Sequence, residues 1–237
     1  MRTVLDVDWN EVNLLPGGTR ARSGRKLRAF ESVTIHWIGP FPRQAVETPR
    51  HWWLTGPDGQ GVHASYHFIV RDERCLQVLP LDEMAWHAGD GAQGPGNSTS
   101  VAIGVVPLNE AGEFSQATVG TLRRLIAELG PPRVARHFEW TRKDCPRFYT
   151  PFVPGGDDRW AQLLARLNRP AVPGEGPVEE SAPEAPVGSF DADALARRII
   201  RGEFGNGSAR VPAVVAAGFT EVQAREAQAR VNVLLRG

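Results

Sequence analysis

The chain has 237 residues, of which 41% are hydrophobic and 8% aromatic, enough for one full domain and a smaller second one. Twenty-seven basic residues balance 27 acidic ones, so no bulk charge favours nucleic acid or an anionic membrane as a partner. No apolar run is long enough for a membrane span, and the acidic start "MRTVLDVDWNEVNLL" is unlike a secretory signal. We therefore expect no nucleic-acid partner, no membrane insertion, no signal peptide and a monomeric chain.

The first 168 residues predict an α/β domain in which strands and helices alternate. β-Branched and aromatic segments predict strands at 32–39, 65–71, 75–81 and 100–106. The proline- and glycine-rich stretch 40–64 predicts loop and a short helix. Helices are predicted at 115–130, between a Ser115 cap and a Gly130 stop, and at 157–168. This order predicts a mixed central β-sheet flanked by helices.

The remainder of the chain divides into a linker and a small module. Residues 169–187 are rich in proline and glutamate and lack aromatic residues, which predicts an interdomain linker. Residues 188–237 predict a three-helix module whose small core makes it marginally stable alone. We therefore predict domains at 1–168 and 188–237.

Scarce reactive residues meet in the segment "RHFEWTRKDCP", residues 136–146. The whole chain has six histidines, two lysines and two cysteines, and His137, Lys143 and Cys145 lie together here. Zinc prefers nitrogen and sulfur ligands, and a catalytic site supplies three of them. His36 is the best candidate for the third, because it lies in the apolar strand "VTIHWIG", where burial of a histidine is costly.

Other interpretations of these residues stay open at this point. His63 and His67 have a spacing that imitates a helical metal pair, but in a strand that spacing separates two residues by about 13 Å. His36 alone fits a core histidine, Cys145 a small buried thiol and Lys143 a solvated charge. The spacing predicts a metal site without excluding these alternatives.

Several segments, in order, resemble one known family. They are "VTIHW", "SYHFIVRDERCLQVLP", "AWHAGDG", "NSTSVAIGVV" and "RHFEWTRKDCP". Over about residues 30 to 150 they are similar to the zinc-dependent N-acetylmuramoyl-L-alanine amidases of the amidase-2 type, which include phage endolysins and peptidoglycan recognition proteins. The resemblance implies a mixed sheet flanked by helices and one Zn²⁺ per chain at the floor of a cleft. It assigns the zinc to His36, His137 and Cys145.

The same resemblance implies catalytic and substrate-binding roles. Tyr66 and Lys143 become the catalytic residues, and His87, with Trp86 beside it, is placed on the substrate groove. Trp37 is a further candidate for stacking on the glycan strand, although a tryptophan equally fits a core position.

One residue type departs from the family pattern. Many relatives carry a glutamate where this chain has Val105 and Val106. A glutamate general base is therefore absent from this strand, which implies the tyrosine and lysine version of the site.

The tail resembles a second family, the CW_7 cell-wall-binding repeat. The similarity lies in "IIRGEFGNG", "AAGF" and "QARVN" between residues 195 and 235. It suggests that Arg201 contacts a muropeptide carboxylate and that Phe204 supplies a stacking face. The alternative is a plain helical bundle in which Phe204 belongs to the core.

Together these resemblances predict an endolysin, a peptidoglycan hydrolase that cuts the amide between N-acetylmuramic acid and L-alanine. Its partner is peptidoglycan, bound through the muropeptide and the glycan strand. The alternatives are a recognition protein that does not cut, and a zinc peptidase that cuts another stem-peptide amide. The expected course is accumulation in the host cytoplasm until release, followed by action at the bacterial cell wall.

Overall fold

The computed structural model describes residues 3–39, 44–168, 191–205, 210–217, 219 and 221–234. The chain forms two compact units, residues 1–180 and 181–237, and each is considered by itself. The predicted linker, residues 169–187, lies outside the described residues, so its boundaries stay a prediction. No helix of the described residues has the length and apolar character that crossing a membrane requires.

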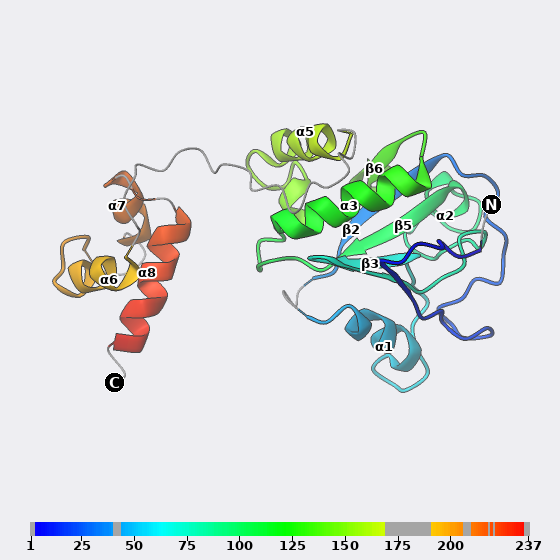
Figure 1. Cartoon of the computed structure of the whole chain (residues 1–237), viewed down its shortest axis with the longest axis horizontal. Coiled ribbons are helices and arrows are strands. Elements are labelled where there is room, and N and C mark those ends of the chain that lie inside the picture. Colours follow the sequence, from blue (N-terminus) through cyan, green and yellow to red (C-terminus); the bar gives the residue numbers. More distant parts are fainter. Residues whose placement is uncertain are drawn as a thin grey trace. The chain divides into compact units, whose positions relative to one another are not determined.

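The larger unit is built on one six-stranded mixed sheet (Figure 1). Its strand order is β1-β4-β3-β5-β2-β6, and every pairing is parallel except the antiparallel hairpin of β3 and β4. The strands are β1 (Asn10–Val12), β2 (Ser32–Trp37), β3 (Phe68–Arg71), β4 (Arg74–Gln77), β5 (Ser100–Val105) and β6 (Val134–Arg136). The predicted mixed sheet with flanking helices is confirmed.

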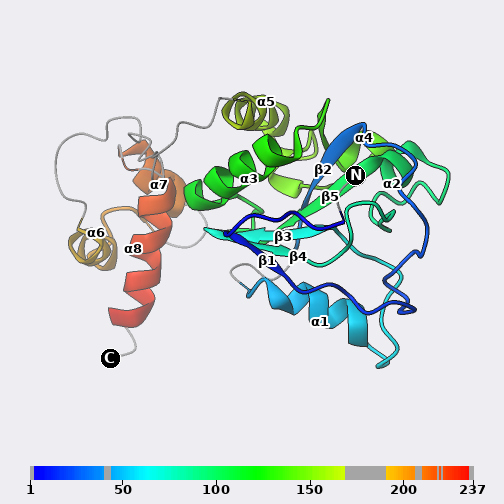
Figure 2. The same ribbon diagram turned by 45° about the vertical axis from the view of Figure 1, so that its right-hand side comes forward.

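Helices cover both faces of this sheet, as the two views in Figures 1 and 2 show. Helices α3 (Gln116–Leu129) and α5 (Gly156–Leu167) lie over one face, and α1 (Glu47–Thr55) lies over the other. Each face has its own apolar core, because alternate residues of a strand point to opposite sides. The short helices are α2 (Pro95–Thr99), α4 (Phe138–Thr141) and the 3-10 turn η1 (Arg147–Tyr149).

Helix α3 begins and ends where its sequence predicts. The Ser115 hydroxyl accepts a hydrogen bond from the N–H of Thr118 at 3.1 Å. Gly130 ends the helix in the left-handed conformation, with φ of 58°. The four predicted strands are confirmed in place, although β3 and β4 are shorter than expected. Strands β1 and β6 were not predicted, because three residues are too few to show an alternating pattern.

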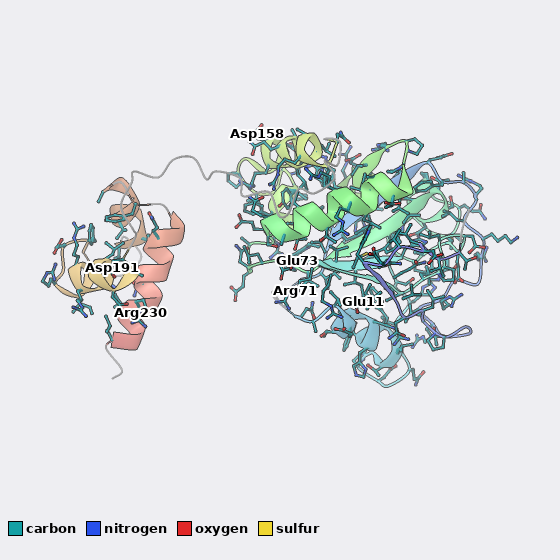
Figure 3. The ribbon with its side chains drawn as sticks, in the orientation of Figure 1. Glu11, Arg71, Glu73, Asp158, Asp191 and Arg230 are labelled. Carbon is teal, nitrogen blue, oxygen red and sulfur yellow. The ribbon has the colours of Figure 1, made fainter. Side chains whose placement is uncertain are left out.

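The part of the smaller unit that the structure describes contains three helices, α6 (Ala192–Ile200), α7 (Arg210–Ala216) and α8 (Glu221–Leu234), as predicted. Asp191 caps α6 by accepting hydrogen bonds from two backbone N–H groups. Arg230 of α8 forms an ion pair with Asp193 of α6, and Figure 3 labels Arg230 and Asp191 on these helices. The core consists of apolar side chains from all three helices and the turn after α6.

Candidate metal centre

Strand β2 brings His36 to one end of the sheet. Val33 and Ile35 belong to the core under α3, so the alternation of the strand directs Thr34 and His36 to the opposite face. The His36 side chain has no exposed surface. A polar ring is therefore held in the interior by two strands that flank it.

The segment after β6 brings the other two residues to the same place. Ile35 of β2 pairs with Arg136 of β6, so His137 follows directly at the strand end that carries His36. After α4, Arg142 adopts the left-handed conformation, with φ of 59°, and reverses the chain. The N–H of Phe138 then donates to the carbonyl of Cys145 at 2.9 Å, which closes the loop.

The three predicted ligands therefore converge. The donor atoms of His36, His137 and Cys145 all lie within 4.8 Å of one another, and all three side chains are buried. The Nδ1 atom of His36 lies 3.7 Å from the Cys145 sulfur. His63 and His67 do not belong to this cluster: His67 instead accepts from the Ala102 N–H and contacts the Glu83 carbonyl oxygen.

The chemistry of this cluster fits a metal ion. The Nε2 atom of His137 lies 2.9 Å from the carbonyl oxygen of Ala88, an acceptor only, so Nε2 carries the proton. Its Nδ1 atom is buried without a hydrogen-bond partner and keeps a free lone pair. An unpartnered buried nitrogen costs stability, and a metal ion bound there would satisfy it.

Burial fixes the charge states of the same residues. It lowers the pKa of His137 to about 4 and holds that of His36 well below its usual value, so both rings are neutral. Burial raises the pKa of the Cys145 thiol to about 12, because loss of solvation disfavours the thiolate more than the nearby Lys143 charge favours it. Two neutral imidazoles and a sulfur that a metal would deprotonate form the donor set that zinc prefers.

The predicted catalytic residues lie beside the cluster. The Tyr66 ring stacks on His36 with 4.4 Å between ring centroids, and burial raises the pKa of its hydroxyl, which keeps the proton at neutral pH. Lys143 is exposed, and its charge lowers the pKa of both His137 and Cys145, so it acts on the ligands from the solvent side. Gly104 makes room for Tyr66, because a Cβ at this position would lie 2.3 Å from the tyrosine Cδ2.

The predicted groove residues take three different positions. His87 is 8% exposed, and its Nδ1 lies 3.0 Å from Nε2 of His36. It therefore contacts a predicted metal ligand. Trp37 is half-buried, with the Arg147 guanidinium 5.0 Å from its ring. Trp86 is half-buried, and its ring centroid lies 4.4 Å from that of exposed His63.

The two tail residues occupy contrasting positions. The side chain of Arg201 is 61% exposed and forms an ion pair with Glu203 at 2.8 Å. Phe204 is 8% exposed and belongs to the tail core, under the guanidinium of Arg198. Phe204 therefore packs the module. Of the glycine turn beside Arg201, Gly205 has the expected positive φ of 69°, and residues 206–209 lie outside the described residues.

The sequence interpretation missed two groups at the site. Asn97 is 2% exposed and bonds the backbone of the "AWHAG" segment, and the Ala88 carbonyl holds His137. In the sequence Asn97 opens the family-like segment "NSTSVAIGVV", but as a turn-type residue after "GDGAQGPG" it gives no sign of this role. Gly104 does carry a weak sequence signal, since a glycine inside a strand often marks close approach of another group.

Fold and site together define an α/β domain with a buried His-His-Cys cluster, which could hold a metal ion, at one end of a mixed sheet. Residues 26–148 match the Amidase_2 family, described as N-acetylmuramoyl-L-alanine amidase. The chain belongs to this family. Residues 193–235 match the CW_7 repeat.

Individual relatives agree with this assignment. The chain is 35% identical over 130 residues to the N-acetylmuramoyl-L-alanine amidase CwlH of Bacillus subtilis, covering 53% of this chain and 47% of the relative. It is 33% identical over 140 residues to the N-acetylmuramoyl-L-alanine amidase XlyA of the same species, covering 57% of this chain and 45% of the relative. The chain thus spans about half the length of these curated relatives.

Solved structures show the same fold. A mutant endolysin from Bacillus subtilis superimposes with a TM-score of 0.53 and 29% identity, covering 67% of this chain and 97% of that one. The catalytic domain of XlyA gives a TM-score of 0.52 and 28% identity, covering 67% and 98%. The larger unit therefore corresponds to nearly the whole of each of these structures.

Proposed function

We propose that the chain is a zinc-dependent peptidoglycan hydrolase that cleaves the amide between N-acetylmuramic acid and L-alanine. The observation that carries this proposal is the convergence of His36, His137 and Cys145, with donor atoms within 4.8 Å of one another. Membership of the amidase family and the names of the relatives support the choice of bond.

A zinc ion held by these three residues would activate water near neutral pH and polarise the scissile carbonyl. The residues of the chain do the rest. Lys143 places a cation where negative charge develops on the carbonyl oxygen, and the protonated Tyr66 hydroxyl donates a hydrogen bond to the reacting group. Buried Val105, at the end of β5, and Val106, which follows it, offer no carboxylate. Lys143 and Tyr66 are therefore the polar side chains that we assign to the reaction.

The tail module would hold the enzyme at its substrate. The CW_7 match supports binding of the cell wall by residues 193–235. A wall-binding module joined to a hydrolase raises the effective concentration of the enzyme at the wall, even when the affinity of a single repeat is low. We propose peptidoglycan as the partner of both units, and a monomer as the working form.

Digestion of purified peptidoglycan, with mass analysis of the products, tests this function. The zinc-loaded chain should release intact glycan strands and stem peptides that begin with L-alanine. Cys145→Ser should lose zinc and activity, whereas Cys75→Ser, which changes the only other cysteine, should keep both.

Three outcomes would contradict the proposal. New reducing sugar ends would indicate a glycosidase, and peptides cut at another amide would indicate a stem-peptide peptidase. Binding of peptidoglycan by the zinc-loaded chain without any cleavage would indicate a recognition protein.

A further inference from the structure

Two consecutive residues hold both histidine ligands from behind. His87 Nδ1 lies 3.0 Å from Nε2 of His36, and the carbonyl oxygen of Ala88 lies 2.9 Å from Nε2 of His137. In both rings the contacted nitrogen is Nε2. This leaves Nδ1 of His36 beside the Cys145 sulfur and Nδ1 of His137 without a partner. One short backbone segment therefore acts on both rings.

These contacts decide which nitrogen of each ring can bind a metal. A carbonyl oxygen only accepts, so His137 is protonated on Nε2 and its unpartnered Nδ1 is the ligand atom. His36 has Nδ1 beside the Cys145 sulfur, so binding a metal there needs the proton on Nε2, from which it can be donated to Nδ1 of His87. Both ligands thus need the same tautomer, which the Ala88 carbonyl imposes on His137 and whose Nε2–H the His87 ring can accept from His36.

A single buried side chain fixes the position of this segment. The Oδ1 atom of Asn97 accepts hydrogen bonds from the N–H groups of His87 and Ala88, both at 2.8 Å. Its Nδ2 donates to the carbonyl of Gly91 at 3.1 Å. Asp90 in turn accepts from the N–H of Asn97, and Asn97 is only 2% exposed. Three hydrogen bonds therefore hold the amide, and two of them are to the residues that contact the ligands.

We propose that Asn97 is a positioning residue for the metal: through His87 and Ala88 it sets the orientation and tautomer of His36 and His137. This inference rests on the proposed zinc-dependent function. Groups that orient metal ligands typically contribute about 10–100-fold to metal affinity. Asn97 does so at one remove, because it fixes the backbone from which both contacts are made.

Zinc affinity, measured by competition with a chelator, tests the proposal on the full chain. Asn97→Ala should weaken zinc binding by about 10–100-fold. Asn10→Ala is the matched control, because Asn10 is also buried and bonds backbone, but lies on β1 at the opposite edge of the sheet from β6. It should lower stability and leave zinc affinity unchanged.

Two further measurements separate positioning from a general loss of structure. ¹⁵N NMR of the metal-free chain should show His36 and His137 protonated on Nε2, and Asn97→Ala should give mixed tautomers. Asn97→Asp keeps an acceptor for the N–H groups of residues 87 and 88, so it should recover most of the lost affinity. The wild-type tautomers, and the zinc affinity of Asn97→Asp compared with that of the wild type, carry the test even where Asn97→Ala does not fold.

The outcomes distinguish this inference from the function on which it rests. A wild-type chain that binds no zinc would overturn both. A wild-type chain that binds zinc, with Asn97→Ala equal to it in affinity, would overturn the positioning role alone. So would an Nδ1–H tautomer of either ligand in the wild-type chain, or an Asn97→Asp variant as weak as the alanine variant.

Discussion

The larger unit, which we propose is catalytic, and the tail module differ in where the structure places their motif residues. In the catalytic domain, His36, His137 and Cys145 come from segments about 100 residues apart and meet with their donor atoms within 4.8 Å. In the tail, Arg201 and Phe204 are near neighbours in the sequence, yet one lies in solvent and the other in the core. Convergence of polar atoms from distant segments thus marks the candidate metal centre, whereas closeness of two residues in a motif does not mark a site.

The satisfaction of buried polar atoms shows the same contrast. Among its buried side-chain atoms without a hydrogen-bond partner, the larger unit contains Nε2 of His87 and Nδ1 of His137, and a metal ion bound at Nδ1 of His137 would satisfy that atom. Among the described residues of the tail, no buried side-chain nitrogen or oxygen lacks a partner.

The largest predicted effect tests whether Phe204 is structural. Phe204→Ala should destabilise the tail by about 3–5 kcal/mol, which a three-helix module of this size cannot absorb. Circular dichroism should show early loss of helix, while the thermal transition of the catalytic domain is unchanged. Ile200→Ala, a change to an exposed residue of α6, is the control. A folded Phe204→Ala tail that no longer binds cell walls would instead make Phe204 a ligand contact.

The next effect tests whether Lys143, the exposed lysine of the segment 136–146, takes part in the reaction. Lys143→Met should lower kcat by about 10²–10³-fold, because one donor aimed at the developing charge is lost, at a cost of about 2.7–4 kcal/mol. The melting temperature and zinc content should be unchanged. Lys26→Met, which changes the other lysine of the chain, should keep full activity. Equal rates for the two variants would remove Lys143 from the reaction.

Sequence reasoning succeeded where the signal is local or where burial makes a residue type expensive. Ser115 and Gly130 mark the ends of α3 in the sequence, and His36 is conspicuous in an apolar strand. It failed for Asn97, because the amide acts on backbone groups about ten residues away, and only the folded turn brings them together. The same limit applies to the Ala88 carbonyl. Every residue has a backbone carbonyl, so the residue type does not indicate which one accepts a hydrogen bond at the site.

A third effect concerns His67, a histidine of the same domain that lies outside the metal cluster. Burial lowers its pKa from the usual 6.5 to about 4, so between these values the unfolded chain binds a proton that the folded chain does not. Its contribution is therefore complete above pH 6.5 and is lost as pH falls towards 4, by about 3 kcal/mol in total.

Chemical denaturation of the metal-free chain at several pH values measures this contribution. His36 and His137 titrate in the same direction but are present in both chains, so the difference between wild type and His67→Gln isolates His67. The variant should be less stable at neutral pH, and its stability should fall less steeply between pH 6.5 and 4. Parallel curves would show that His67 carries a proton in the folded state.

The smallest effect concerns Arg201, the exposed tail cation. Its ion pair with Glu203 lies in solvent, so Arg201→Ala should leave the melting temperature of the tail unchanged. If the guanidinium contacts a carboxylate of the wall, sedimentation with purified cell walls should show binding weakened by up to about tenfold. Arg197→Ala removes the same charge from an exposed position of α6 and should bind as wild type does. Equal losses in the two variants would mean that the tail is attracted by net charge and that no specific contact at Arg201 exists.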